Sequence, residues 1–157
     1  MESSLLKGIC YGLTSGVITT LGLIVGLNSF TESKLFIIGG VLTIAIADSF
    51  SDSLGIHISE ESSNKSHKGV WKATLSTFFA KMLFSLTFIV PIMMFDYPIS
   101  VYVSIGWGFL LLGLLSYYIA TMNKTNPIKV ILEHLGIALV VVVLTHYIGD
   151  FISLVFV

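Results

Sequence analysis

Two aspartates stand one helical turn apart in a strongly apolar part of this chain. Asp48 and Asp52 directly follow residues 37–47, in which Thr43 is the only side chain with a polar group. A carboxylate at the centre of a membrane helix costs roughly 2.5–3.5 kcal/mol. At i, i+4 spacing both side chains project from one face and bring four oxygen atoms to one place. Hard divalent cations prefer such oxygen ligands, so the pair predicts a metal site.

A structural alternative stays open for the same pair, because protonated or ion-paired carboxyls can simply hold helices together. Lys81 is the candidate partner, since counting 1.5 Å per residue from the helix ends puts it at a depth similar to that of Asp52. A structural ion pair between them would weaken the metal hypothesis for Asp52. It would leave Asp48 unaffected.

A second i, i+4 pair, His146 and Asp150, lies near the C-terminus. Neutral imidazole is a metal ligand, and the carboxylate would orient it or accept a proton. The same counting of residues puts His146 near the depth of Asp48, which favours an auxiliary ligand. The alternative is a hydrogen-bonded histidine without a ligand role.

The first apolar segment contributes a stripe of small residues, with glycines at positions 8, 12, 16, 22 and 26. Glycines at this spacing let membrane helices approach closely. Ser15 and Thr19 share the stripe and predict a polar wall beside the aspartates.

Further titratable side chains gather where the second segment ends and the last one begins. They are His57, Glu60, Glu61, Glu133 and His134. A ring of carboxylates and imidazoles would concentrate a divalent cation before entry. The alternative is that they are only solvated helix ends.

Composition identifies the environment of these groups. Of 157 residues, 55% are hydrophobic and 11% are charged, against about 25% charged in soluble domains, and the mean hydropathy is +0.95. This composition predicts an integral membrane protein with a single domain over residues 1–157. The net charge of −1 and the absence of a basic block exclude nucleic acid as a partner. Cys10 is the only cysteine, which excludes a thiolate-rich metal site within one chain.

Five apolar segments have the length of about 20 residues that a membrane helix needs. They cover about 8–28, 35–57, 70–95, 100–122 and 130–156. The sequence therefore predicts an all-α bundle of five transmembrane helices.

Lysines predict the orientation, because short positively charged joints stay in the cytoplasm. One side of the membrane would hold Lys7, Lys65, Lys68, Lys72, Lys124 and Lys129, and the other side only Lys34. We therefore expect a cytoplasmic N-terminus and a non-cytosolic C-terminus at Val157.

Four short motifs lie in residues 12–26, 47–59, 90–91 and 145–149. They resemble motifs of the vacuolar iron transporter family. Residues 12–26 resemble its first-span signature, in which Asp-Gly, two apolar residues and Thr-Thr precede a glycine-ended apolar run. Residues 47–59 follow its second-span pattern Ala-Gly-Ala-x-Ser-Met-x-x-Gly-Glu-x-x-Ser at Ala47, Ser51, Gly55 and Ser59. Residues 90–91 resemble its third-span proline, and residues 145–149 its fifth-span ending.

The resemblance implies a five-span homodimer that moves Fe²⁺ or Mn²⁺ out of the cytosol in exchange for protons. The chain departs from the family at the ligands: the family's first-span Asp falls on Ser15, its Met on Asp52, its Glu on Ile56 and a glycine on Asp48. The chain would be a short form, because residues 59–69 replace the Glu-rich cytoplasmic helices of long members.

We therefore expect a multi-pass transporter of divalent metals in a prokaryotic cell membrane, with the ion as substrate and no cofactor. Two alternatives remain, a transporter of another solute that uses the aspartates as proton carriers, and a non-transporting membrane module. An enzyme is not expected, because the sequence offers no nucleophile–base pair with a supporting third group.

Overall fold

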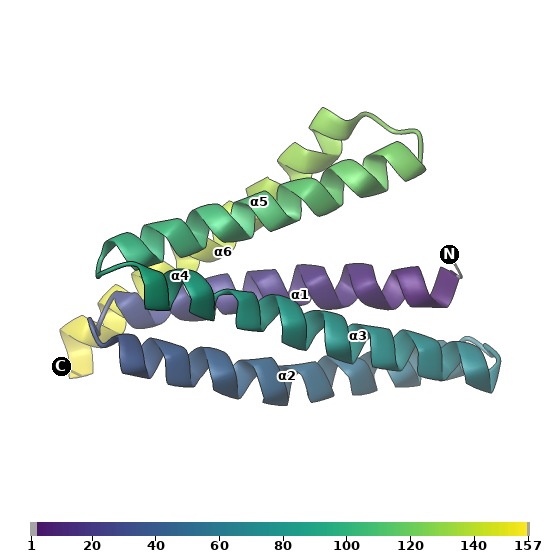
Figure 1. The fold of residues 1–157 in the computed structure, drawn as a ribbon, viewed down its shortest axis with the longest axis horizontal. Helices are drawn as coiled ribbons and strands as arrows, with labels where there is room; N and C mark the ends of the chain where they lie inside the picture. Colours follow the sequence, from purple (N-terminus) through teal and green to yellow (C-terminus); the bar gives the residue numbers. More distant parts are fainter. Residues whose placement is uncertain (1–2, 157) are drawn as a thin grey trace.

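The computed structural model describes residues 3–156, nearly all of them helical (Figure 1). In chain order the helices are α1 (Ser3–Asn28), α2 (Lys34–Ser62), α3 (His67–Thr87), α4 (Ile89–Met94), α5 (Ile99–Met122) and α6 (Pro127–Phe156). The described residues contain no strand, which confirms the all-α prediction. Val157, the expected non-cytosolic terminus, lies outside the described residues.

Five stretches are long and apolar enough to cross a membrane, which confirms the predicted number of spans. They are α1, α2, α3 with α4, α5 and α6. This arrangement fits a multi-pass membrane protein.

The third span consists of two helices because of Pro91. Proline has no backbone N–H, and its ring clashes with the carbonyl group four residues earlier. That residue is Thr87, the last residue of α3, and Phe88 separates it from α4. The span expected as one helix over residues 70–95 is therefore interrupted in its second half.

The joint between α2 and α3 is shorter than predicted. Helix α2 continues past residue 57 to Ser62 and ends before Asn64, whose φ of 52° is a left-handed conformation that asparagine tolerates. Helix α3 begins at His67, because the Ser66 hydroxyl accepts a hydrogen bond from the Gly69 N–H at 3.2 Å and caps the helix.

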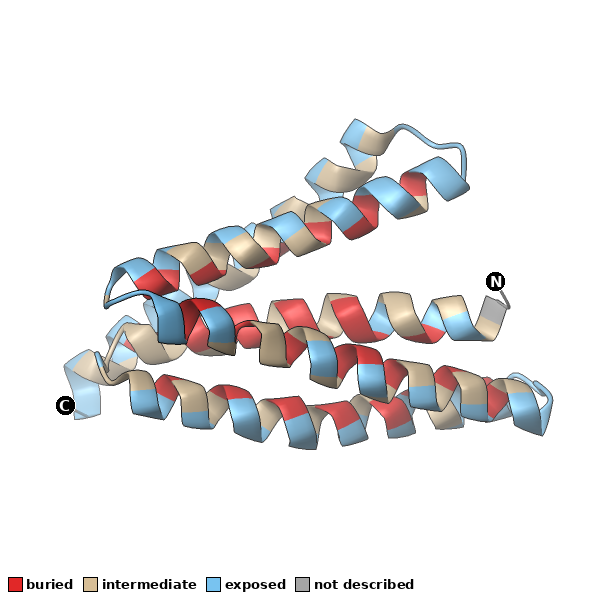
Figure 2. Cartoon of the chain, viewed as in Figure 1, coloured by how far each residue is buried: buried red, intermediate tan, exposed pale blue. Residues whose placement is uncertain are grey.

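Helix α1 is the centre of the bundle. It contacts α2 and α3 on one side and α5 and α6 on the other, whereas α2 and α6 do not contact one another. Figure 1 shows α5 and α6 diverging from the other helices toward the end that holds the N-terminus. Buried residues accordingly follow the inner faces of the helices, and α6 is the most exposed span (Figure 2).

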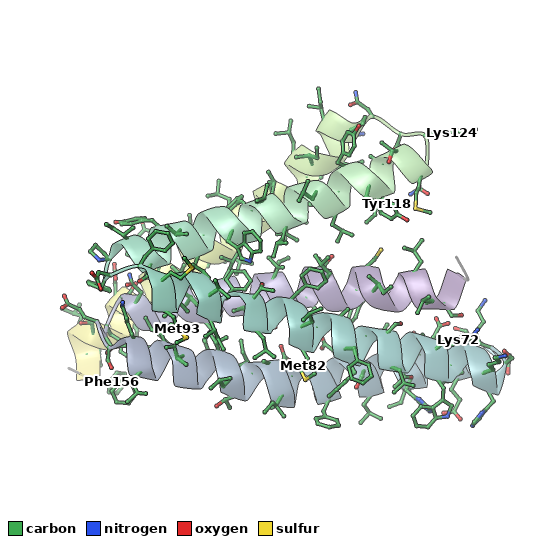
Figure 3. The ribbon with its side chains drawn as sticks, in the orientation of Figure 1. Lys72, Met82, Met93, Tyr118, Lys124 and Phe156 are labelled. Atoms are coloured by element: carbon green, nitrogen blue, oxygen red, sulfur yellow. The ribbon has the colours of Figure 1, made fainter. Side chains whose placement is uncertain are left out.

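The start of α1, the α2–α3 joint and the α5–α6 joint all lie at the same end of the structure, which we call the lysine-rich end. Lys72 and Lys124 lie there in Figure 3, and Met93 and Phe156 lie at the opposite end. At that opposite end the Lys34 ammonium pairs with the Asp96 carboxylate at 3.3 Å. The predicted separation of the lysines is thus present in the fold.

Glycines allow α1 and α3 to approach one another. A Cβ atom on Gly12 would lie 2.5 Å from the Thr77 carbonyl oxygen, and one on Gly16 would lie 2.9 Å from the Lys81 carbonyl oxygen. Real Cβ atoms do not approach other atoms this closely. Close packing of the two helices therefore depends on both glycines.

We expect Gly12→Ala to lower the free energy of unfolding by roughly 1–3 kcal/mol, the usual cost of overpacking, and Gly16→Leu to prevent assembly. Thermal unfolding in detergent would measure both effects. Gly106→Ala is the matched control, because nothing lies within 4 Å of its added Cβ. Full stability of Gly16→Leu would contradict the contact between α1 and α3.

Candidate functional site

Four side chains from three helices meet near the middle of the bundle. The Lys81 ammonium of α3 lies 2.6 Å from Asp48 Oδ2 and 2.5 Å from Asp52 Oδ2, both on α2. It also donates to the Ser15 hydroxyl of α1 at 2.8 Å, and Ser15 donates to Asp52 Oδ2 at 2.6 Å. We call these four residues the ion cluster.

Each helix places its contribution for a local reason. The i, i+4 spacing on α2 turns both carboxylates toward α3. Lys81 is buried where α3 packs against Gly12 and Gly16 of α1, whose missing side chains make room for its backbone. The glycine stripe of α1 therefore determines the position of the ammonium.

The cluster satisfies the hydrogen bonding of the buried cation. An ammonium group has three donors, and Asp48, Asp52 and Ser15 provide three acceptors. Two carboxylates and one ammonium carry a net charge of −1 when all are ionised. The side chain of Asp48 is 32% exposed and that of Asp52 18%, whereas that of Lys81 is 1% exposed. The cluster is thus closed on the lysine side and open beside Asp48.

The predicted depth match between Lys81 and Asp52 is confirmed by their contact. The expectation that such a pair would leave Asp48 unaffected is wrong, because the long lysine side chain reaches both carboxylates. Ser15 belongs to the cluster as expected. Thr19 instead donates to the Ser15 carbonyl of its own helix at 2.9 Å.

His146 and Asp150 lie away from the ion cluster. His146 Nδ1 is 2.8 Å from the Ser29 hydroxyl just beyond α1, and its Nε2 is 3.4 Å from Asp150 Oδ2. Ser29 is fourteen residues after Ser15, roughly 20 Å along a helix. The expected proximity of His146 to Asp48 is therefore wrong, because α6 places His146 beside the C-terminal end of α1. Ser29 is not identifiable from the sequence, because no sequence motif connects it to His146, which lies 117 residues later.

The residues expected at the mouth divide into two groups. On α2, His57 Nδ1 lies 3.0 Å from the Thr74 hydroxyl, and the nearly fully buried Glu60 forms an ion pair with Lys7. Glu61 is exposed.

On α6, Glu133 is exposed and lies 4.0 Å from Lys129, while His134 Nδ1 is 2.7 Å from the Ser116 hydroxyl. Because α2 and α6 make no contact, one chain does not assemble the expected ring.

Within residues 3–156, no three His, Cys, Asp or Glu side chains are arranged to hold a metal ion together. The ion cluster offers two carboxylates and a hydroxyl group. The Lys81 ammonium fills the central position between these oxygen atoms.

Comparison with protein-family models, with curated proteins and with solved structures gives no match. The fold defines an all-helical chain with five candidate membrane spans. The resemblance to vacuolar iron transporters stays a prediction from the residues alone.

Lys81→Met should lower the free energy of unfolding by roughly 3–5 kcal/mol, because it leaves two carboxylates close together without their counter-ion. Adding Asp52→Asn should recover part of the loss by removing one of these charges. Thermal unfolding in detergent would measure both variants. Lys129→Met is the matched control at an exposed lysine, and equal stability of the two single variants would contradict a structural role for the cluster.

Proposed function

We propose that this protein is a membrane transporter that exchanges a divalent first-row metal ion, with Fe²⁺ or Mn²⁺ favoured, for protons. The observation that carries the proposal is the convergence of Asp48 and Asp52 on a single cation position at the middle of the bundle. Two carboxylates and the Ser15 hydroxyl provide oxygen ligands, which suit these ions better than they suit Cu⁺.

Lys81 gives this site a mechanism for release. While no metal ion is bound, its ammonium neutralises part of the carboxylate charge and keeps the buried site stable. An arriving cation must displace the ammonium from Asp48 and Asp52, and the returning ammonium then helps to expel the ion. Carboxylates bind either protons or metal ions, so protonation on one side of the membrane competes with the metal.

The direction of transport follows from the orientation we propose. The lysine-rich end would face the cytoplasm, in accordance with the positive-inside rule. His57, Glu60, Glu61, Glu133 and His134 would then lie on the side of metal entry, and His146 with Asp150 near the exit, where they act as an auxiliary ligand and a proton acceptor. The transporter would therefore export the ion from the cytosol.

We expect Asp48→Asn and Asp52→Asn each to reduce metal flux at least tenfold while the protein stays folded, because the amide keeps the shape and removes the charge that balances a divalent cation. Proteoliposomes containing a metal-sensitive dye would measure the uptake of Fe²⁺, Mn²⁺, Co²⁺, Zn²⁺ and Ca²⁺. Acid on the side of metal binding should inhibit this uptake.

Asp96→Asn is the matched control, because this carboxylate is fully exposed at the opposite end. Normal metal flux in both Asp48→Asn and Asp52→Asn would show that the two aspartates have only a structural role.

We further propose that the protein is a homodimer that packs through α2. Six small residues follow its exposed face at spacings of four: Gly39, Thr43, Ala47, Ser51, Gly55 and Ser59. Small residues favour close helix contacts in membranes. The open side of Asp48 lies beside this face and would meet hydrocarbon without a partner. The exposed face of α6 instead carries large apolar residues such as Leu139, Val143 and Leu144, which suit lipid.

In a Cys10→Ser background, Ala47→Cys and Gly55→Cys should form disulfide-linked dimers on mild oxidation in membranes, because close α2 helices bring paired Cβ atoms to within about 4 Å. Non-reducing gels would measure the dimer. Val143→Cys on α6 is the matched control and should stay monomeric. Efficient crosslinking only through α6 would place the interface on the other side of the bundle.

A second candidate function has its own observation. Because Lys81 contacts both carboxylates, the cluster also suits a transporter of another solute in which the aspartates carry only protons. In that case the proteoliposomes would show proton flux that does not depend on any metal ion. A non-transporting module would show neither flux, and the Asn variants would alter assembly alone.

A further inference from the structure

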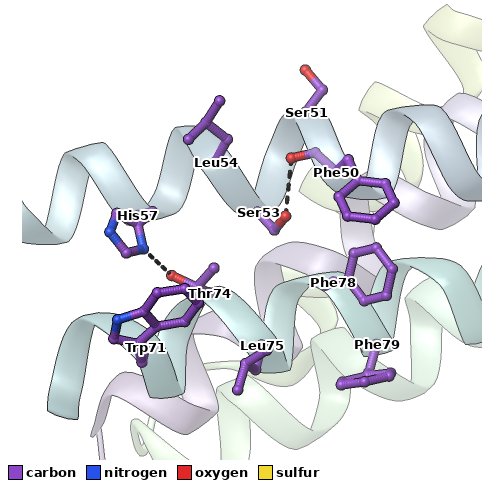
Figure 4. Close-up of a pocket in the computed structure, with 10 residues that line it drawn as sticks. All are labelled: Phe50, Ser51, Ser53, Leu54, His57, Trp71, Thr74, Leu75, Phe78 and Phe79. Atoms are coloured by element: carbon purple, nitrogen blue, oxygen red, sulfur yellow. Dashed lines mark hydrogen bonds between the residues drawn. The ribbon is translucent and has the colours of Figure 1, made fainter.

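An apolar groove opens on the outer surface between α2 and α3, and at Ser51 it borders the small-residue face of α2 that we propose as the dimer interface. It has a volume of about 660 Å³, within the range of about 300–1,000 Å³ that is usual for ligand pockets. Leu54 of α2 and Leu75 and Phe79 of α3 line it, and Figure 4 shows the Phe50 ring of α2 facing the Phe78 ring of α3. The Phe50 and Phe78 rings close its inner end, with centroids 4.7 Å apart.

The outer end of the groove is polar and lies toward the lysine-rich end. His57 bonds the Thr74 hydroxyl there, and its ring meets that of Trp71 edge-on with centroids 5.0 Å apart. The Trp71 indole N–H in turn donates to His67 Nε2 at 3.2 Å. The groove thus has the His57–Thr74 hydrogen bond near this end and two facing phenylalanine rings at the other.

Positive charge lies just beyond this polar end. Lys68 is one turn before Trp71 on the same face of α3, and Lys65 lies in the joint. Both lysines are exposed, and neither has an ion-pair partner among the described residues. Glu60 is paired with Lys7, so Glu61 is the nearest carboxylate on α2 that could oppose them. The charge at the mouth of the groove therefore favours an anion.

The length of the groove fits one leaflet of a bilayer. Phe79 is eight residues after Trp71, roughly 12 Å along a helix, and half of a hydrocarbon core is about 15 Å. We propose that this groove binds an anionic phospholipid, with one acyl chain between α2 and α3 and the phosphate beside Lys68 and Lys65. Lysines at a membrane surface attract such headgroups.

The chain provides a direct probe, because it has only two tryptophans. Trp107→Phe leaves Trp71 in the groove, and Trp71→Phe leaves Trp107, which lies on α5 and donates to Thr87. Each variant would be reconstituted over the same series of mole fractions of phosphatidylglycerol or phosphatidylcholine with brominated acyl chains. Bromine quenches only nearby indole rings.

We expect half-maximal quenching of Trp71 at a concentration of brominated phosphatidylglycerol that is roughly fivefold lower than that of brominated phosphatidylcholine. This difference corresponds to about one lysine–headgroup interaction. Lys68→Gln should remove this preference, whereas Lys129→Gln on α6 should retain it. Trp107 should be quenched equally by both lipids. Native mass spectrometry of the wild type, which should retain phosphatidylglycerol, repeats the test without a tryptophan substitution.

Two results would overturn the proposal. Equal quenching of Trp71 by both lipids would make the groove an ordinary lipid-facing surface. Shielding of Trp71 from both lipids would mean that protein, such as a second copy of the chain, covers the groove. Neither result depends on metal transport.

Discussion

The buried ammonium group of Lys81 is the constraint on which the rest of the structure depends. A lysine at this depth in a membrane protein is stable only if its donors and its charge are satisfied nearby. Asp48, Asp52 and Ser15 satisfy them and thereby connect α1, α2 and α3. The glycines of α1 are necessary for the same reason, because they bring the backbone of α3 close enough for this connection.

The same interaction places the Lys81 ammonium where we propose that a metal ion binds. Without the ammonium, the two carboxylates would repel one another. The ammonium lies at the end of a flexible side chain. When the metal ion leaves, the ammonium returns to Asp48 and Asp52, so the carboxylate charge does not stay uncompensated. Protons enter our account separately, because a protonated Asp48 or Asp52 loses the charge that binds the metal ion.

Much of the fold could be predicted from the sequence, because membrane spans are defined by length and hydropathy. The five spans, the separation of the lysines and the similar depth of Asp52 and Lys81 all follow from counting along single helices. The errors came from relations between helices. Counting could not show that Lys81 reaches Asp48 as well, or that α6 brings His146 to Ser29 instead of to the aspartates. Helix α2 is longer than its apolar segment. Glu60 is charged and marks a polar border in the sequence, but in the structure it is a buried residue of α2 that pairs with Lys7.

Calorimetric titration of the purified protein with Mn²⁺ in two buffers of different ionisation enthalpy tests the central claim most directly. Our account predicts saturable binding at one site per chain, a release of protons at acidic pH, where the metal ion displaces protons from the carboxylates, and loss of both signals in the Asp48→Asn/Asp52→Asn variant. Binding that is unchanged in this variant, or no binding by the wild type, would contradict the claim that the ion cluster exchanges its internal cation for a metal ion.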